Sequence, residues 1–448
     1  MVWRLLIFSG LVLVGLLAVG RVPLRYNLRN LAARWKTTLL TALAFTAVVA
    51  LLTVMLAFVN GMRRMTENTG VPANVLVLAD GATDEAFSNL SSGDVMEIEN
   101  LGGEGIPPVA RDARQRRLAS RETYMIVNQP IPNAPPGRPK RRFVQLRGVE
   151  DPEITAQVHE VTLAAGQWFS EAGVRELGAE TGAAAGRTAI EAVLGEGLAI
   201  ELAKDRPARL RASSGARRLE VGDTFELGQR TWVVVGIMAS EGSTFNSEIW
   251  ASRALVATTF GKNTYTTLVV RLSDAESARQ FKQYLLREHR GAAVSPQIES
   301  EYYASLSETS RQFLYAITFL AVVMSVGGIF GVMNTMYAAI SQRIKDIGVL
   351  RLLGYARWQI LVCFLLESLA IALLGGLLGA ALGSLSDGWS ATSIITGGAG
   401  GGKSVALKLD VDSHIWAIGI QLTLVMGFLG GLLPALSAMR LRAIEALR

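Results

Sequence analysis

Long apolar runs alternate with polar stretches along this chain, and the longest polar stretch lies between the first long run and the other three. A helix needs roughly 20 apolar residues to cross the ~30 Å hydrocarbon core of a bilayer. Four runs meet this length and predict transmembrane helices at 38–60, 313–340, 358–385 and 413–438. A shorter apolar run at 1–20 is typical either of a cleaved signal peptide or of an extra transmembrane helix.

The charges that follow the short run favour the uncleaved helix. Five basic residues come directly after it: Arg21, Arg25, Arg29, Arg34 and Lys36. A cleaved signal peptide would leave them outside the cell, against the tendency of basic residues to stay on the cytoplasmic side. Four apolar residues recur among them at helical spacing: Leu24, Leu28, Leu31 and Trp35. We therefore predict an extra N-terminal transmembrane helix at 1–20 and a cytoplasmic amphipathic helix at 21–37.

The polar stretch at 61–312 has the pattern of a folded domain. Short runs rich in β-branched residues predict strands at Asn74–Leu78, Phe143–Leu146, Thr231–Val235 and Leu268–Leu272. Ala275–Arg287 predicts a helix. The proline-containing part between about 80 and 140 reads mostly as loop. We therefore predict an α+β domain, and the two flanking transmembrane helices place it outside the cytoplasm.

A short charged segment, 341–357, separates the second and third of the long apolar runs. Its apolar residues fall near helical spacing on one face: Ile344, Ile347, Leu350 and Leu353. Its basic residues place it on the cytoplasmic side. Such a segment is either an ordinary interfacial helix or a helix that receives a push from a partner protein.

The charge pattern also orients the remaining segments and narrows the class of protein. The loop at 386–412 is not basic and is predicted outside, whereas the tail at 439–448 carries three arginines and is predicted in the cytoplasm. The chain is 50% hydrophobic with a net charge of +6, and its basic residues crowd the ends of the apolar runs. The charge therefore indicates a membrane protein, and we do not expect nucleic acid as a partner.

Candidate metal and nucleotide chemistry is sparse. Cys363 is the only cysteine, which excludes disulfides and Cys-based zinc sites within one chain, and the three histidines lack metal-ligand spacing. Gly397–Ser404 matches G-x-x-x-x-G-K-[ST], but a phosphate-binding loop needs a buried strand before it and a helix after it. Here VALKLDVD follows and alternates like a strand, so the match is interpreted as a glycine-rich tether.

Two features of the apolar runs suggest how the helices associate. Glycines recur at four-residue spacing: Gly327 and Gly331; Gly375, Gly379 and Gly383; Gly427 and Gly431. Such faces let membrane helices approach closely, either within this chain or at a sliding interface with a second copy of it or a related chain. Glu367 lies inside an apolar run, where a carboxylate is costly. We interpret it as a structural hydrogen-bonding group in preference to a proton relay.

Residues 331–383, GVMNTMYAAISQRIKDIGVLRLLGYARWQILVCFLLESLAIALLGGLLGAALG, resemble the signature block of MacB-type ABC transporter permeases, the FtsX-like family. The tail GFLGGLLPALSAMRLRAIEALR is also similar. Weaker likenesses occur in the family's order within the polar domain: LAAGQWF, VLGEGLAIELA, VGDTFELGQRTWVVVGIMA and SEIWASRALVATTFG. The resemblance implies a multi-pass α-helical membrane protein with four core transmembrane helices and a MacB-like α+β periplasmic core domain.

The resemblance also implies a function. The chain would be the permease subunit of an ABC transporter in a bacterial inner membrane, coupling ATP hydrolysis in a separate ATPase to movement of the external domain. Segment 341–357 would be the coupling helix, and the best-matching positions are Arg343, Lys345, Asp346, Ile347, Gly348, Leu350, Arg351 and Gly354. The family usually has Glu at position 346. Gly354 would end the helix. ATP and magnesium would bind the partner, leaving this chain without catalytic residues or a cofactor.

The implied partners are an ABC ATPase dimer, a second permease copy, identical or related, and membrane lipids, with a periplasmic adaptor or lipoprotein as an open question. The cargo class in the family is a lipoprotein, a peptide or an amphiphile. Two other functions remain open from the residues alone. The chain could be an FtsX-like transducer that regulates a cell-envelope enzyme without transport, or a membrane-anchored scaffold without an ATPase.

Overall fold

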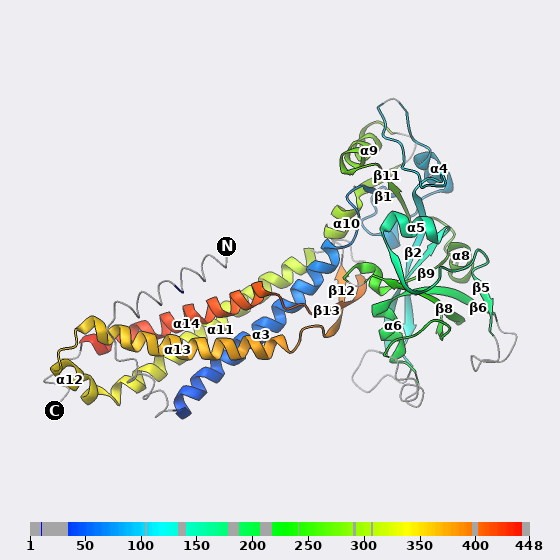
Figure 1. Cartoon of the computed structure of the whole chain (residues 1–448). Coiled ribbons are helices and arrows are strands. Elements are labelled where there is room, and N and C mark those ends of the chain that lie inside the picture. Colours follow the sequence, from blue (N-terminus) through cyan, green and yellow to red (C-terminus); the bar gives the residue numbers. More distant parts are fainter. Residues whose placement is uncertain are drawn as a thin grey trace. The chain divides into compact units, whose positions relative to one another are not determined.

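The computed structural model divides the chain into two compact units (Figure 1), the first holding residues up to Asn60, 312–389 and 408 onward, the second Gly61–Arg311 and 390–407. It describes residues 10, 35–103, 105–132, 140–177, 188–206, 217–240, 242–289, 293–305, 308–396 and 402–440. The helix predicted at 1–20 and all but the last three residues of the helix predicted at 21–37 therefore lie outside the described residues, apart from Gly10.

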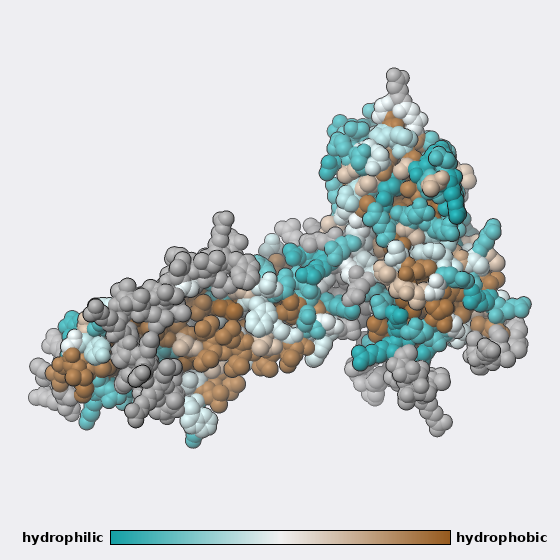
Figure 2. Space-filling model, viewed as in Figure 1, coloured by the Kyte–Doolittle hydropathy of each residue, from teal (hydrophilic) through white to brown (hydrophobic). Residues whose placement is uncertain are grey.

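Four long helices build the first unit. They are α3 (Trp35–Glu67), α11 (Glu308–Ser341), α13 (Arg357–Ser384) and α14 (Ser413–Arg440). Each is long and apolar enough to cross a membrane. α3, α11 and α14 include the runs predicted at 38–60, 313–340 and 413–438, and α13 covers all but the last residue of the run predicted at 358–385. Figure 2 shows brown side chains gathered over these helices and mostly teal ones over the second unit.

Five of the seven predicted packing glycines lie at close contacts inside this chain. A Cβ added at Gly375 or Gly379 would lie 2.6 Å from the carbonyl oxygen of Ala42 or Thr46 on α3. Gly383 also faces α3, and a Cβ added at Gly427 or Gly431 of α14 would collide with α13. Glycine is therefore needed where α13 meets its two neighbours.

The other two packing glycines behave differently. A Cβ added at Gly327 or Gly331 of α11 would meet nothing within 4 Å among the described residues. Of the four long helices α11 is also the least buried. Of the two interpretations that the sequence leaves open, packing within the chain is therefore not seen at these two glycines among the described residues.

A mixed β-sheet forms the second unit, in the order β11-β1-β10-β2-β3-β9-β6-β8-β4, with β5 paired to β6 and β7 to β8. The β3–β9 and β6–β8 pairs are parallel, and most other pairs are antiparallel. The strands are β1 (Asn74–Ala79), β2 (Ala119–Pro130), β3 (Arg141–Val149), β4 (Thr162–Gly166), β5 (Val174–Glu176), β6 (Thr188–Gly195), β7 (Thr224–Leu227), β8 (Arg230–Ala239), β9 (Glu248–Ser252), β10 (Thr267–Arg271) and β11 (Val294–Ile298).

Short helices accompany this sheet: α4 (Ser92–Glu99), α5 (Pro152–His159), α6 (Glu196–Ala203), α8 (Arg253–Phe260), α9 (Ala275–Arg287), α10 (Glu299–Ser305) and the 3-10 turns η1 (Glu85–Phe87) and η3 (Thr244–Ser247). The predicted helix at Ala275–Arg287 is confirmed by α9, which begins after an N-cap, Asp274, that accepts hydrogen bonds from two backbone N–H groups. All four predicted strands are confirmed by β1, β3, β8 and β10.

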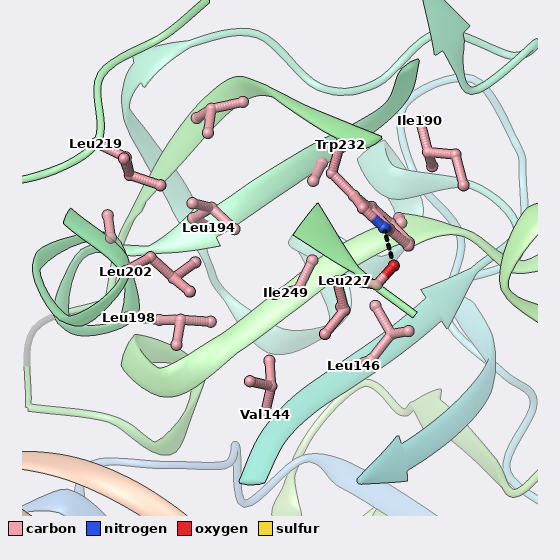
Figure 3. Close-up of a cluster of buried hydrophobic side chains, with 14 of the residues drawn as sticks. Val144, Leu146, Ile190, Leu194, Leu198, Leu202, Leu219, Leu227, Trp232 and Ile249 are labelled. Carbon is pink, nitrogen blue, oxygen red and sulfur yellow. Dashed lines mark hydrogen bonds between the residues drawn. The ribbon is translucent and has the colours of Figure 1, made fainter. Parts of the chain in front are cut away.

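Two separate apolar clusters pack against the sheet, each on a different set of strands. One packs α4 and α9 with β1 and β10. The other packs α6 and α8 with β3, β6, β8 and β9 (Figure 3). Inside the second cluster the indole N–H of Trp232 donates to the backbone oxygen of Leu227 at 2.9 Å, the dashed bond of Figure 3, so the buried ring has no unpaired polar atom.

The interpretation of 80–140 as mostly loop missed one central strand. This part contains η1, α4 and the 12-residue strand β2, which pairs with both β3 and β10 in the middle of the sheet. The strand was missed because its sequence, ASRETYMIVNQP, places polar residues at buried positions. Ser120, Glu122 and Thr123 are almost fully buried, so alternation of apolar and polar residues does not mark the strand.

The segment after α13 forms a β-hairpin from β12 (Ser390–Thr396) and β13 (Gly402–Lys408). Residues 397–401 lie outside the described residues. Lys403 and Ser404 of the nucleotide-loop match lie on β13, so the match continues into a strand, as the alternation of VALKLDVD predicts, and no helix begins there.

Candidate functional site

The charged segment between α11 and α13 forms a short helix, α12 (Ile344–Leu352). Its C-terminus has the hydrogen bonds of a Schellman motif: the N–H of Gly354 donates to Arg351 and the N–H of Tyr355 to Leu350, both at 3.2 Å. Gly354 has φ +94°, which a residue with a side chain rarely adopts. The sequence prediction that Gly354 ends this helix is confirmed.

An ion pair holds the start of α12 to α13. Arg343, the N-cap residue, donates from its two terminal nitrogens to the two carboxylate oxygens of Glu367 at 2.8 and 2.9 Å. Both side chains are buried, and the guanidinium also lies 6.0 Å from the ring centre of Phe364. The geometry is the bidentate one that an arginine and a carboxylate prefer. Glu367 thus has the structural hydrogen-bonding role that we expect from its sequence context.

The same side of α12 packs into the helical unit. Ile347 is 1% exposed and joins a cluster with Ile340, Ile360 and Phe364. Gly348 is buried beside it. Ile347 and Arg343, two of the positions that the resemblance assigns to the coupling helix, therefore do not lie on its outer face, because Ile347 is buried against the chain's own helices and Arg343 turns inward to Glu367.

The opposite side of α12 is open. Leu352 and Leu353 are 65% and 71% exposed, and Val349 is also exposed. Lys345 and Asp346 are exposed beside them, whereas Leu350 and Arg351 are half-buried. Sequence reasoning missed Val349 and Leu352, since spacing shows which residues share a face but not which of two partly apolar faces meets the helices of the same chain.

The charged groups of this arrangement are paired or face outward, and among the described residues no group of three or more His, Cys, Asp or Glu could hold a metal ion. What the arrangement offers is a short helix with one face fixed to α13 and the other exposing apolar and charged side chains. That combination suits a surface for protein contact.

Two family models match the chain. The MacB-like periplasmic core domain matches residues 38–288, and the FtsX-like permease C-terminal domain matches residues 318–443. The chain belongs to the MacB-like, FtsX-like permease family. The second match includes α12 and Glu367, so the site lies within the permease domain. This family and the four apolar helices make the chain a membrane protein with a large α+β domain.

Individual relatives agree with this assignment. The uncharacterized ABC transporter permease YknZ of Bacillus subtilis is 26% identical over 240 residues, covering 50% of this chain and 57% of that protein. The macrolide export ATP-binding/permease protein MacB of a Shewanella species is 27% identical over 394 residues, covering 84% and 55%. The chain therefore spans about half the length of the curated relatives it matches.

Among solved structures, the extracellular domain of the noncanonic ABC-type transporter YknZ from Gram-positive bacteria is similar at 14% identity. The match covers 50% of this chain and 99% of that domain with a TM-score of 0.32.

Proposed function

We propose that this chain is the permease subunit of an ABC transporter complex in a bacterial inner membrane. A separate ABC ATPase hydrolyses ATP, and the permease converts that cycle into movement of its α+β domain outside the cytoplasm. ATP and magnesium bind to the ATPase, and this chain supplies no catalytic residue. The cargo belongs to the class of lipoproteins, peptides and amphiphiles.

The observation that carries the proposal is the two-faced construction of α12. Its outer face offers Val349, Leu352 and Leu353 for an apolar contact and Lys345 and Asp346 for the register of that contact. Its inner face is tied to α13 by Arg343 and Glu367. A push on the outer face would therefore reach α13 directly, which is the property that a coupling helix needs.

A second permease copy is the partner that best fits α11. Gly327 and Gly331 lie on a face of the least buried long helix that no described residue covers at these positions, and small residues at this spacing permit close approach of another helix. Membrane lipid would cover the rest of that face. The proposal leaves open whether the second copy is identical or related, and whether an adaptor or lipoprotein binds outside.

The proposal is tested by replacing Leu352 with aspartate in a chain co-expressed with its ABC ATPase partner. A carboxylate in a desolvated contact costs about 2–5 kcal/mol, so we expect the ATPase to be lost on purification. Leu385→Asp is the matched control, because Leu385 is 68% exposed, directly after the opposite end of α13. It should retain the ATPase.

Equal retention of the ATPase by the wild-type chain and by both variants, with unchanged ATP turnover, would contradict docking at α12. The alternative FtsX-like transducer shares the docking step. It differs in that purified complex in vesicles would hydrolyse ATP and activate an envelope enzyme without moving any lipoprotein, peptide or amphiphile.

A further inference from the structure

A network of buried acidic and basic side chains crosses the sheet unit, and neither the family assignment nor the docking helix uses it. It begins at Arg147 on β3, whose guanidinium donates to both oxygens of Glu248 on β9 at 2.7 and 2.8 Å. The same group donates to Glu85 on η1 at 2.9 Å and to Glu122 on β2. All four side chains are fully buried.

His159, the last residue of α5, extends this network of side chains. Its Nε2 lies 2.7 Å from Glu122 and its Nδ1 lies 2.5 Å from Glu299, so both ring nitrogens face a carboxylate oxygen. Both must donate, which makes the ring an imidazolium. Burial alone lowers the pKa of His159, but the charges of Glu299 and Glu122 outweigh it and raise the pKa to about 10.

Glu299 is the last side chain of this network, and it also binds the segment that follows α3. Its second carboxylate oxygen accepts from the backbone N–H of Val71 at 2.8 Å and from the amide of Asn74 at 2.7 Å. Val71 and Asn74 belong to the segment that follows α3 in sequence. Glu299 itself is the first residue of α10, which precedes α11.

The segment after α3 also lies directly against Glu299. Gly70 has φ +87°, and a Cβ added there would lie 2.9 Å from the carbonyl carbon of Glu299. Asn74 in turn accepts from Arg271 of β10 at 2.5 Å. Both chain connections, the one arriving from α3 and the one leaving toward α11, therefore meet at one carboxylate.

We propose that the Glu299 carboxylate, completed by the His159 imidazolium, is a clamp that holds both connecting segments on the sheet. When it opens, residues 69–74 and α10 come off the sheet while the two apolar clusters stay folded. The other end of this polar network is secured independently, because Arg147 has two further carboxylate partners, whereas His159 is the only charged group bonded to Glu299 among the described residues.

Glu299→Gln tests the clamp because glutamine has a single acceptor oxygen. That oxygen can face either His159 or the pair formed by Val71 and Asn74, and the amide N–H₂ then faces donors on the other side. We expect backbone amides of 69–74 and 299–305 to exchange hydrogen about tenfold faster or more in the intact chain in lipid nanodiscs. Amides of β6 and β8 should exchange as in the wild-type chain.

Glu301→Gln is the matched control on the same helix, since Glu301 pairs with Lys282 at 3.0 Å but is 59% exposed. It should leave exchange unchanged. Where Glu299→Gln does not purify as a folded chain, Glu299→Asp keeps the charge and shortens the reach, and the same local acceleration is expected. Unchanged exchange at 69–74 and 299–305, or equal acceleration throughout β6 and β8, overturns the clamp. The readout needs neither ATPase nor cargo, so it does not rest on the proposed function.

Discussion

One buried arginine lies in each unit among the described residues, and the two are held in different ways. Arg343 in the helical unit has one carboxylate partner, Glu367. Arg147 in the sheet unit has three, and the network continues through His159 to Glu299. Both guanidinium groups are removed from water, so both depend on their carboxylates.

The difference concerns how many elements each arginine joins. Arg343 joins only α12 to α13, so loss of the pair should be felt at one short helix. Arg147 joins β3 to η1, β2 and β9, and the network adds α5 and α10. A single pair can therefore open at one short helix alone, whereas the network ties several elements of the sheet unit together.

The largest expected effect comes from Arg147→Met, which removes the guanidinium from three buried carboxylates, of which Glu122 keeps another cationic partner, His159. Breaking one buried pair costs about 3–5 kcal/mol, a large part of the ~5–15 kcal/mol that stabilises a domain. We expect the sheet unit to lose its fold or its melting temperature to drop by roughly 10 °C or more. The buried Trp232 and Trp250 report unfolding by fluorescence.

Arg279→Met is the control for that substitution. Arg279 also pairs with a glutamate, at 3.2 Å, but it is 61% exposed on α9. An exposed pair contributes about 0–1 kcal/mol, so the melting temperature should move little. Similar drops in melting temperature for Arg147→Met and Arg279→Met would show that burial does not make Arg147 more important for stability than Arg279.

A second effect concerns pH. Because the folded-state pKa of His159, about 10, lies above the ordinary value of 6.5, its contribution to stability is fully present below pH 6.5. It is lost as the pH rises toward 10, when the ring between Glu122 and Glu299 gives up its proton. We expect the gap in unfolding free energy between the wild-type chain and His159→Gln to shrink by on the order of 3 kcal/mol from pH 6.5 to 10. Urea unfolding at several pH values measures it, and a constant gap would mean that the ring is not charged.

The third effect is local. Glu367→Gln removes the charge opposite Arg343 and should cost roughly 1–3 kcal/mol at α12. Hydrogen exchange should accelerate in 344–352 and not in the sheet unit. The double variant Arg343→Met/Glu367→Leu replaces the pair with apolar side chains, which is often neutral. It should restore slow hydrogen exchange in α12. Faster exchange in the double variant than in Glu367→Gln would contradict the view that this ion pair acts on α12 alone.

The sequence predicts those helices and strands in which apolar residues form one long run or recur at a regular spacing. The four long helices, α9 and the strands β1, β3, β8 and β10 all follow from runs or periods of apolar residues. Gly354 follows from its need for a left-handed conformation. These features depend on local chemistry and are readable without knowing what packs against them.

The rest was not readable because it depends on pairing between distant residues. β2 was taken for loop since Glu122 and Ser120 are polar and buried, and their partners come from elsewhere in the sequence. His159 looked unremarkable for the same reason. On α12, Arg343 and Ile347 were placed among the coupling positions because nothing in the segment itself shows that they turn inward. The partner that holds Arg343 inward, Glu367, comes 24 residues later in the sequence.

The central claim is that the outer face of α12 meets the ATPase while the inner face does not. The most direct measurement is site-specific photo-crosslinking in native membranes, with the photoreactive residue placed at Leu353. Leu353 is 71% exposed, so the account predicts a crosslink to the ATPase that strengthens or weakens with added ATP.

A photoreactive residue at Leu385, which is 68% exposed directly after the other end of α13, should give no crosslink to the ATPase. An ATPase that co-purifies with the chain but crosslinks from Leu385 and not from Leu353 would contradict the account.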